Sequence, residues 1–465
     1  MGSGETIVAV STPPGRGGIG IVRLSGPAAL AVAAEVVSLK AELDHGRARL
    51  GRIVEGPEQR VIDEAVVTAF RTPRSYTGED VVEIATHGSP VVLETVIRGA
   101  LEAGRRLGLE VRLAEPGEFT QRAFASGRLD LTQAEAVHDL IAARTLDQVR
   151  QAAGQLGGGL SRRLAGPKDR LLHLLALLEA GMDFASGELD DVDVVPPPYI
   201  EAEIAGVLAE LRALERSFAG GHLLRQGVGM ALVGRPNAGK SSIFNYLLER
   251  DRAIVTPMAG TTRDTVEESW SLGGIPLRLV DTAGLRGMGT EADEKPVDEA
   301  EAMGIARSRE ALADADLVLV VHDATLPLSE GERELLEELE HRPHLLVANK
   351  ADLPGVDAEL WATTLATSTV TGEGMEALRE RILSLLGADS ALAETAALTT
   401  PRQLAAIQAG IQALEQAAEA NQAGLPHEVL LVDLHRAREA VDGLTGQTTP
   451  DDILQRIFST FCIGK

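Results

Sequence analysis

The chain has 465 residues, more than one compact domain of about 250–300 residues holds, so the sequence predicts two to four domains. With 44% apolar and 24% charged residues it has an ordinary globular composition, which excludes a largely disordered chain. A net charge of −25 argues against a protein that coats nucleic acid independently of the nucleic-acid sequence, although a local basic patch or a partner could hold RNA. Because no run of 18 apolar residues and no secretory signal is found, and Cys462 is the only cysteine, we expect a cytoplasmic protein without a disulfide framework.

The first 120 residues predict an α+β domain. Short runs rich in Val and Ile favour strands at 5–10, 18–26, 63–70 and 80–88. Helical patterns at 27–38 and 89–107 separate these strands. The turns at 13–18 and 72–80 are natural places for a binding site.

Residues 121–223 change to apolar spacings of three and four, which predict amphipathic helices at 131–156, 162–184 and 200–218. His173 is expected in the core of this bundle or at its boundary. Further helices are expected after residue 388, at 401–422, 426–442 and 450–459. Residues 224–387 alternate strand and helix, as in a doubly wound parallel sheet. The simplest architecture has one helical bundle domain, formed by 121–223 together with 388–465, into which this α/β domain is inserted. Two separate bundles would give the same sequence pattern.

A phosphate-binding loop is the clearest signal in the chain. An apolar strand runs into GRPNAGKS at 234–241 and then into a helix, the context that the pattern G-x-x-x-x-G-K-[ST] requires. Glycines let backbone N–H groups wrap phosphates, and the helix N-terminus adds partial positive charge. Lys240 would reach the β- and γ-phosphates, and Ser241 would ligate Mg²⁺.

The other nucleotide motifs follow in order. Asp281 to Gly284 reads DTAG after a strand, and Thr261 with Thr262 can supply a second Mg²⁺ ligand. Asp352 closes an Asn-Lys-x-Asp motif, and its carboxylate matches the N1–H and N2–H donors of guanine, which adenine lacks. The sequence therefore predicts a GTPase, with these nucleotide-binding residues: Asn237, Ala238, Gly239, Lys240, Ser241, Ser242, Thr256, Thr261, Asp281, Thr282, Ala283, Gly284, Asn349, Lys350, Asp352 and Ser368.

The groups that hydrolyse GTP are less obvious. Leu285 stands where Ras-like enzymes place a water-orienting glutamine. Asn237 offers a neutral oxygen beside the phosphates and could hold a monovalent cation in place of an arginine finger. Asn237 could equally serve only to shape the loop.

The whole chain resembles the MnmE (TrmE) family of tRNA-modification GTPases. The similarity rests on TIVAVSTPPGRGGIGIVRLSG (6–26), YTGEDVVEIATHG (76–88), RLAEPGEFTQRAFASGRLDLTQAEAV (112–137), GRPNAGKSS (234–242), AGTTRD (259–264), DTAGLR (281–286) and the terminal FCIGK (461–465). Several of these motifs are not typical of other GTPase families.

The resemblance implies an architecture and a function. It implies a folate-binding N-terminal domain at 1–120 similar to the glycine-cleavage T-protein, a helical domain, and an inserted Ras-like P-loop G domain. It also implies a homodimer that joins an FAD-containing partner, MnmG (GidA), in a heterotetramer. Together they would add an aminomethyl or carboxymethylaminomethyl group to C5 of the tRNA wobble uridine. The one-carbon unit would come from 5-formyl- or 5,10-methylene-tetrahydrofolate, and GTP turnover would depend on Mg²⁺ and K⁺.

Carried over by motif, the resemblance also implies site residues. Glu301, with Glu299 as the alternative, would orient the attacking water, and Lys240 and Asn237 would complete the catalytic set. Cys462 is expected to line a site near the tail, without covalent catalysis. The ligands implied are Asn237, Thr256, Met258 and Thr261 for K⁺, Ser241 and Thr262 for Mg²⁺, and Arg23, Glu83, Arg128 and Lys465 for folate.

Two other functions share parts of this pattern. A ribosome-assembly GTPase would carry the same nucleotide motifs, but it should also carry a recognisable basic RNA module, and this acidic chain shows none. A stand-alone one-carbon transferase with a regulatory G domain would show folate-dependent turnover without a flavoprotein.

Overall fold

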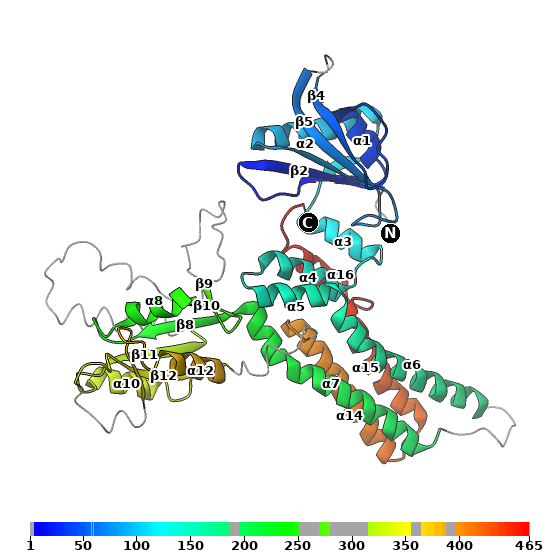
Figure 1. Ribbon diagram of the computed structural model, residues 1–465. Helices are drawn as coiled ribbons and strands as arrows, with labels where there is room; N and C mark the ends of the chain where they lie inside the picture. The colour runs from blue at the N-terminus through cyan, green and yellow to red at the C-terminus, as the bar shows by residue number, and fades with distance from the viewer. Residues whose placement is uncertain are drawn as a thin grey trace.

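The computed structural model describes residues 4–56, 58, 60–185, 195–250, 269–279, 315–354, 364–386 and 397–464. Figure 1 shows a sheet domain at one end, a long helical bundle extending away from it, and a second sheet beside the bundle. This arrangement confirms the multidomain class. No helix among the described residues combines the length and the apolar character that a bilayer crossing requires.

The N-terminal domain is a seven-stranded sheet in the order β3-β4-β5-β6-β2-β1-β7, covered by two helices. Its pairings are antiparallel except for the parallel pair β1–β7. The register places Arg23 of β2 opposite Glu83 of β6. The elements are β1 Thr6–Val10, β2 Gly17–Ser25, α1 Ala29–Val36, β3 Val37–Leu39, β4 Ala48–Glu55, β5 Arg60–Phe70, β6 Val81–Gly88, α2 Pro90–Leu107 and β7 Val111–Leu113.

Helices from both flanks of the G domain share one core. Leu171 and Leu211 pack in the same buried cluster as Leu414 and Leu434, so one bundle, not two, receives the insertion. His173 is exposed, contrary to the expectation for it, because it lies on the outer face of its helix. The helices are α3 Glu118–Ala125, α4 Leu131–Ala142, α5 Leu146–Leu156, α6 Gly159–Ala185, α7 Pro197–Gln226, α14 Pro401–Gln422, α15 His427–Thr445 and α16 Asp451–Phe458.

The segment 131–156 forms two helices, where the apolar spacing predicted one. The Thr145 side chain accepts a hydrogen bond from the Gln148 N–H, and the Gln148 side chain accepts from the Thr145 N–H. This capping box starts a new helix at Leu146. The break places the N-cap of α5 against the turn at Gly274 of the second sheet.

The G domain has a six-stranded sheet in the order β13-β12-β11-β8-β10-β9, parallel except for the antiparallel pair β9–β10. The carboxyl ends of β8, β11 and β12 therefore meet at one edge, where the loop after β8 begins. The elements are β8 Val228–Val233, α8 Lys240–Arg250, β9 Ser269–Leu272, β10 Ile275–Leu279, β11 Leu317–Asp323, α10 Glu330–Glu338, β12 His344–Asn349, β13 Leu365–Thr367 and α12 Met375–Leu385.

The C-terminal tail returns to the N-terminal domain. Ile463 forms an antiparallel bridge with Pro116, and the Ser11 hydroxyl donates to the Gly464 carbonyl at 3.1 Å. Phe458 and Phe461 pack with Leu131 in a cluster below this contact.

Candidate functional site

The loop after β8 has the backbone shape of a phosphate cradle. Gly234 has a φ of 143°, and a Cβ atom there would lie 2.0 Å from the Val321 carbonyl oxygen. Gly239 has a φ of 97°, and its Cβ would lie 2.0 Å from Asn349 Nδ2. Both positions therefore require glycine. Asn237, between them, also has a positive φ, of 63°.

Lys240 begins α8 and folds back over this loop. Its Nζ donates to the carbonyl oxygens of Gly234 and Arg235, each at 2.7 Å. Burial lowers the pKa of Lys240. Among the described residues no carboxylate forms an ion pair with this ammonium, and a partly buried cation that only carbonyls hold fits an anionic ligand such as a phosphate.

The base end of the cleft follows β12 and β13. Asn349 Nδ2 donates to the Ala238 carbonyl at 3.0 Å, which ties the base motif to the phosphate loop. Asn349 Oδ1 is buried and has no hydrogen-bond partner among the described residues, so it is open to a ligand. The Ser368 hydroxyl donates to Asp352 Oδ1 at 2.6 Å and holds the carboxylate in place.

Lys350 forms an ion pair with Asp323 at the end of β11. Burial alone would raise the pKa of Asp323, but hydrogen bonds from Lys350 and Thr325 lower it on balance. Sequence reasoning missed Asp323. Asp323 ends the strand that pairs with the strand of the Asn-Lys-x-Asp motif. An acidic residue at that position is the signal that would have identified it.

One cleft therefore collects most of the described nucleotide-binding residues. Ala238 is buried beneath it. Pro236 and Leu353 were not expected in it. Its lining consists of Pro236, Asn237, Gly239, Lys240, Ser241, Ser242, Asn349, Lys350, Asp352, Leu353, Thr369 and Val370.

The remaining predictions for this site lie outside the described residues. They are Thr256, Met258, Thr261, Thr262, Asp281, Thr282, Ala283, Gly284, Leu285, Glu299 and Glu301. Of the implied metal ligands, Asn237 and Ser241 line the cleft beside Lys240. Their amide and hydroxyl oxygens are the ligand types that K⁺ and Mg²⁺ take, so this part of the set fits.

A second candidate site lies in the N-terminal domain. Arg23 donates from Nη2 and Nε to Glu83 Oε1, at 2.7 and 3.0 Å, and from Nη1 to the Gly464 carbonyl at 3.3 Å. The guanidinium also lies over the rings of Tyr76 and Phe119, 5.7 and 5.6 Å from their centroids. Both bonds from Arg23 go to one oxygen of Glu83, so the other oxygen remains to read the donor edge of a pterin. The residues present fit a folate.

The other predicted folate contacts are placed less completely. Burial raises the pKa of Tyr76, while the charges of Arg23 and Arg128 act in the opposite direction, which puts the exposed Arg128 near the same phenol. Lys465 lies outside the described residues, next to Gly464. Cys462 is exposed, and its carbonyl accepts from the Gly117 N–H at 3.4 Å.

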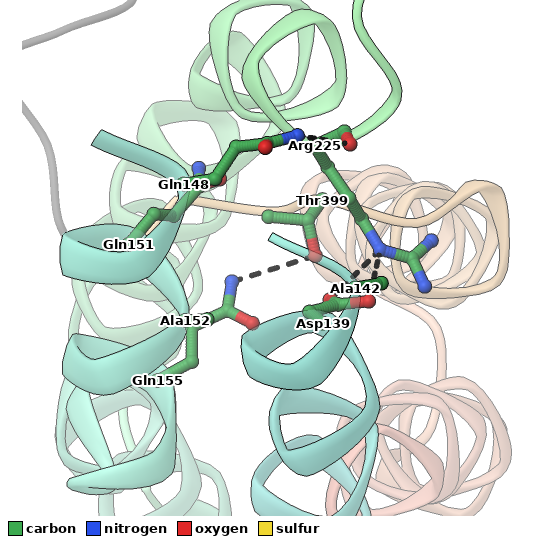
Figure 2. Close-up of a pocket in the computed structure, with 8 residues that line it drawn as sticks. All are labelled: Asp139, Ala142, Gln148, Gln151, Ala152, Gln155, Arg225 and Thr399. Carbon is green, nitrogen blue, oxygen red and sulfur yellow. Dashed lines mark hydrogen bonds and ion pairs between the residues drawn. The ribbon is translucent and has the colours of Figure 1, made fainter. Parts of the chain in front are cut away.

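The helical bundle meets the G sheet beside a small polar cavity (Figure 2). Arg225 at the end of α7 donates from Nε to both carboxylate oxygens of Asp139, at 2.8 Å each. Gln148 Nε2 donates to the Arg225 carbonyl at 3.0 Å. The Thr145 hydroxyl donates to the carbonyl of Gly274, in the turn between β9 and β10, at 3.0 Å. The start of α5 is thus attached to that turn.

Proteins and family models of one kind are similar to this chain along most or all of its length. Residues 6–128 match the family model of the GTP-binding protein TrmE N-terminus, and residues 131–462 match that of the MnmE helical domain. A "tRNA modification GTPase MnmE" of Koribacter versatilis is 50% identical over 471 residues, covering 100% of both chains. Proteins of the same name from Moorella thermoacetica and Roseiflexus sp. are 40% and 41% identical to this chain. Each alignment covers 99% of this chain and 99% of the relative.

Proposed function

Since the chain belongs to the MnmE (TrmE) family of tRNA modification GTPases, we propose that K⁺ stimulates its GTP hydrolysis and that this hydrolysis serves modification of the wobble uridine. With an FAD-containing MnmG (GidA) partner, it would add an aminomethyl or carboxymethylaminomethyl group to C5, using a one-carbon tetrahydrofolate. The observation that carries the proposal is that one chain holds a guanine-type cleft and a separate Arg23–Glu83 pair in the N-terminal sheet.

The nucleotide cleft supports the GTPase half of the proposal. Asp352 would accept the N1–H and N2–H bonds of guanine, and Lys240 would leave its two carbonyl partners for the phosphates. Asn237 and Ser241 would hold K⁺ and Mg²⁺, completed by Thr256, Met258, Thr261 and Thr262. Bound Mg²⁺ and K⁺ supply positive charge that stabilises the transition state of phosphoryl transfer. The water-orienting group would be Glu301 or Glu299.

The Arg23–Glu83 site of the N-terminal domain supports the one-carbon half. Arg23, Glu83, Arg128 and Lys465 would bind the folate, with Glu83 reading the pterin edge. Residues 1–120 would form this folate domain, 224–387 the GTPase domain, and 121–223 with 388–465 the helical domain.

An exposed apolar pair on the N-terminal sheet supports a homodimer. Leu50 and Val66 face each other across β4 and β5 and are 67% and 45% exposed. A second copy would cover them. The net charge of −25 favours a complex in which tRNA is bound mainly through MnmG.

The hydrogen bond between Thr145 and Gly274 offers a route between nucleotide and bundle. The turn at Gly274 joins β9 to β10. In the sequence, the predicted ligand Thr261 precedes β9 and the motif at Asp281 follows β10. A change of nucleotide at those motifs would therefore pull on the turn, and through Thr145 on α5. We propose that hydrolysis drives association and opening of the G domains along this route.

The test is reconstitution of the full chain with MnmG, unmodified tRNA, GTP, Mg²⁺, K⁺, 5,10-methylene-tetrahydrofolate and an amine, either ammonium for the aminomethyl group or glycine for the carboxymethylaminomethyl group. The wobble nucleoside is then weighed by mass spectrometry. The proposal predicts modification only when all components are present. Lys240→Ala should lose both GTP hydrolysis and modification, whereas Arg23→Ala should lose modification alone. Modification without GTP hydrolysis, or folate turnover without the flavoprotein, would contradict the proposal and favour a stand-alone transferase.

A further inference from the structure

A buried charged cluster supports the phosphate-binding loop from behind. The loop begins against β11, where the Gly234 backbone packs on the Val321 carbonyl. The next residue of β11 is His322, which is 1% exposed. Its Nδ1 lies 3.0 Å from Oε1 of Glu332, a residue of the first turn of α10 that is 4% exposed. Glu332 Oε2 lies 3.7 Å from Nε of Arg235, the second residue of the loop.

The hydrogen bonds of His322 define its protonation. Nε2 lies 2.8 Å from the Leu326 carbonyl oxygen, which can only accept, and Nδ1 faces the Glu332 carboxylate. Both ring nitrogens must therefore carry a proton, and the imidazole is cationic. The hydrogen bond that His322 donates to Glu332 raises the pKa of His322, against the effect of burial.

The surrounding charges are consistent with a cation at this position. Asp323 adds a second negative charge beside His322 and is itself paired with Lys350. Arg235 approaches Glu332 from the side of the loop. Glu332 thus lies between two cations, one fixed in the sheet and one on the loop.

A purely structural role for Glu332 is also present. Ser329 donates from its backbone N–H and its hydroxyl to Glu332 Oε2, at 2.9 Å each, and accepts from the Glu332 N–H at 3.2 Å. This capping box starts α10. Capping requires neither a buried histidine nor an arginine from the phosphate loop, so it leaves those two contacts unexplained.

We propose that Glu332 is a positioning residue for the phosphate-binding loop. The Glu332 carboxylate holds the Arg235 side chain, and the imidazolium of His322 holds that carboxylate in place. The Arg235 carbonyl is one of the two acceptors of the Lys240 ammonium. Fixing Arg235 therefore fixes the place from which Lys240 meets the phosphates. Nothing in the GTPase motifs requires this support.

The proposal makes nucleotide affinity depend on pH in a defined direction. The pKa of His322 in the folded chain is raised above 6.5. The support that the His322 cation gives to Glu332 is therefore complete below pH 6.5 and is lost as pH rises through the folded pKa. Once neutral, Nδ1 would turn a lone pair toward Glu332, which would then lose its hold on Arg235. Affinity should fall toward alkaline pH.

The experiment compares Glu332→Gln with the full-length wild type by calorimetric titration with GDP from pH 6 to 9. A glutamine can accept from Ser329 and donate to a neutral His322, so it removes the charge and keeps the fold. At pH 6 the variant should bind GDP about three- to tenfold more weakly, and the difference should shrink as pH rises. Because Lys240 and the titrated GDP are the same in both proteins, the pH dependence of their difference in GDP affinity reports only the cluster of His322, Glu332 and Arg235.

Ser329→Ala is the matched control, because it breaks the capping box and leaves Arg235 in place. It should lower the melting temperature without changing GDP affinity. In an Arg235→Ala background, Glu332→Gln should have no further effect on affinity. Equal GDP affinity of wild type and Glu332→Gln at pH 6, an affinity loss in Ser329→Ala as large as in Glu332→Gln, or additive effects in the double variant would each overturn the proposal.

Discussion

The nucleotide cleft and the N-terminal Arg23–Glu83 site assemble in different ways. The cleft takes Asn349 from the last position of β12, and Lys240 and Asp352 from the segments that follow β8 and β12, at the edge where these parallel strands end. The N-terminal site takes Arg23 and Glu83 from two paired antiparallel strands and is joined by the tail at the Gly464 carbonyl. The nucleotide cleft depends on short contiguous motifs. The Arg23–Glu83 site depends on contacts between residues that are 60 and 441 positions apart in the sequence. Damage to either should therefore leave ligand binding at the other intact.

Asp352→Asn should have the largest effect. It removes two charge-assisted bonds to guanine, each of about 1.5–3 kcal/mol, so GDP affinity should fall roughly 100-fold or more. An asparagine amide can donate to the C2 carbonyl of xanthine, so xanthosine diphosphate should restore binding in this variant and serve as the control for folding. Competition titrations with both nucleotides measure this. Unchanged GDP affinity would break the assignment of the base site.

Arg23→Ala should affect only the other site. Arg23 is half-buried and bonds Glu83 and the tail, so its loss should weaken 5-formyl-tetrahydrofolate binding about 10- to 100-fold while GDP affinity stays the same. Arg49→Ala, which breaks an exposed pair with Asp44, is the matched control and should change neither affinity. Fluorescence titration with the folate distinguishes the two. A parallel loss of GDP binding would mean that the sites are not independent.

The stability of the N-terminal domain should depend on acid through Glu118. Burial opposes the effect, but hydrogen bonds from Arg112, from the Glu115 N–H and from Arg122 lower the pKa of Glu118 below 4.5. A lowered folded pKa gives stability that is present above pH 4.5 and is lost as pH falls through the folded value. Glu118→Gln should therefore cost about 1–3 kcal/mol at pH 7.

That cost should shrink as pH falls through the folded pKa of Glu118, because the protonated carboxyl is then neutral like the glutamine. Hydrogen exchange of the β1 and β7 amides measures it within the domain. Glu35→Gln, at an exposed pair with Arg106, is the control and should cost little at any pH. A cost for Glu118→Gln that does not change at all as the wild type is acidified would show that shape, not charge, makes the residue necessary.

The two sites also differ in how far sequence reasoning reached them. Spacing alone placed Lys240 and Asp352, because each motif lies on one loop whose strand and helix are readable. The pairing of Arg23 with Glu83 needed the register of β2 on β6, and the Gly464 contact needed the return of the tail, neither of which spacing encodes. The resemblance to a known family supplied those residues instead.

Local chemistry explains the misses. The apolar spacing of 131–156 continued through Thr145, so only the capping box with Gln148 reveals the break. Asp323 carried no motif of its own and gained its role from Lys350 on the neighbouring strand. The roles of Glu301, Lys465 and the K⁺ ligands beyond Asn237 stay predictions, since those residues lie outside the described part of the chain.

The most direct test of the account is GTP turnover of the purified chain in K⁺ and in Na⁺ at equal ionic strength, with G-domain association followed in parallel. We expect faster turnover in K⁺ together with K⁺-dependent association, because Asn237 would hold the cation where an arginine finger is absent. Equal, slow rates without association would contradict the cation-stimulated mechanism and leave a GTPase that needs an external activator.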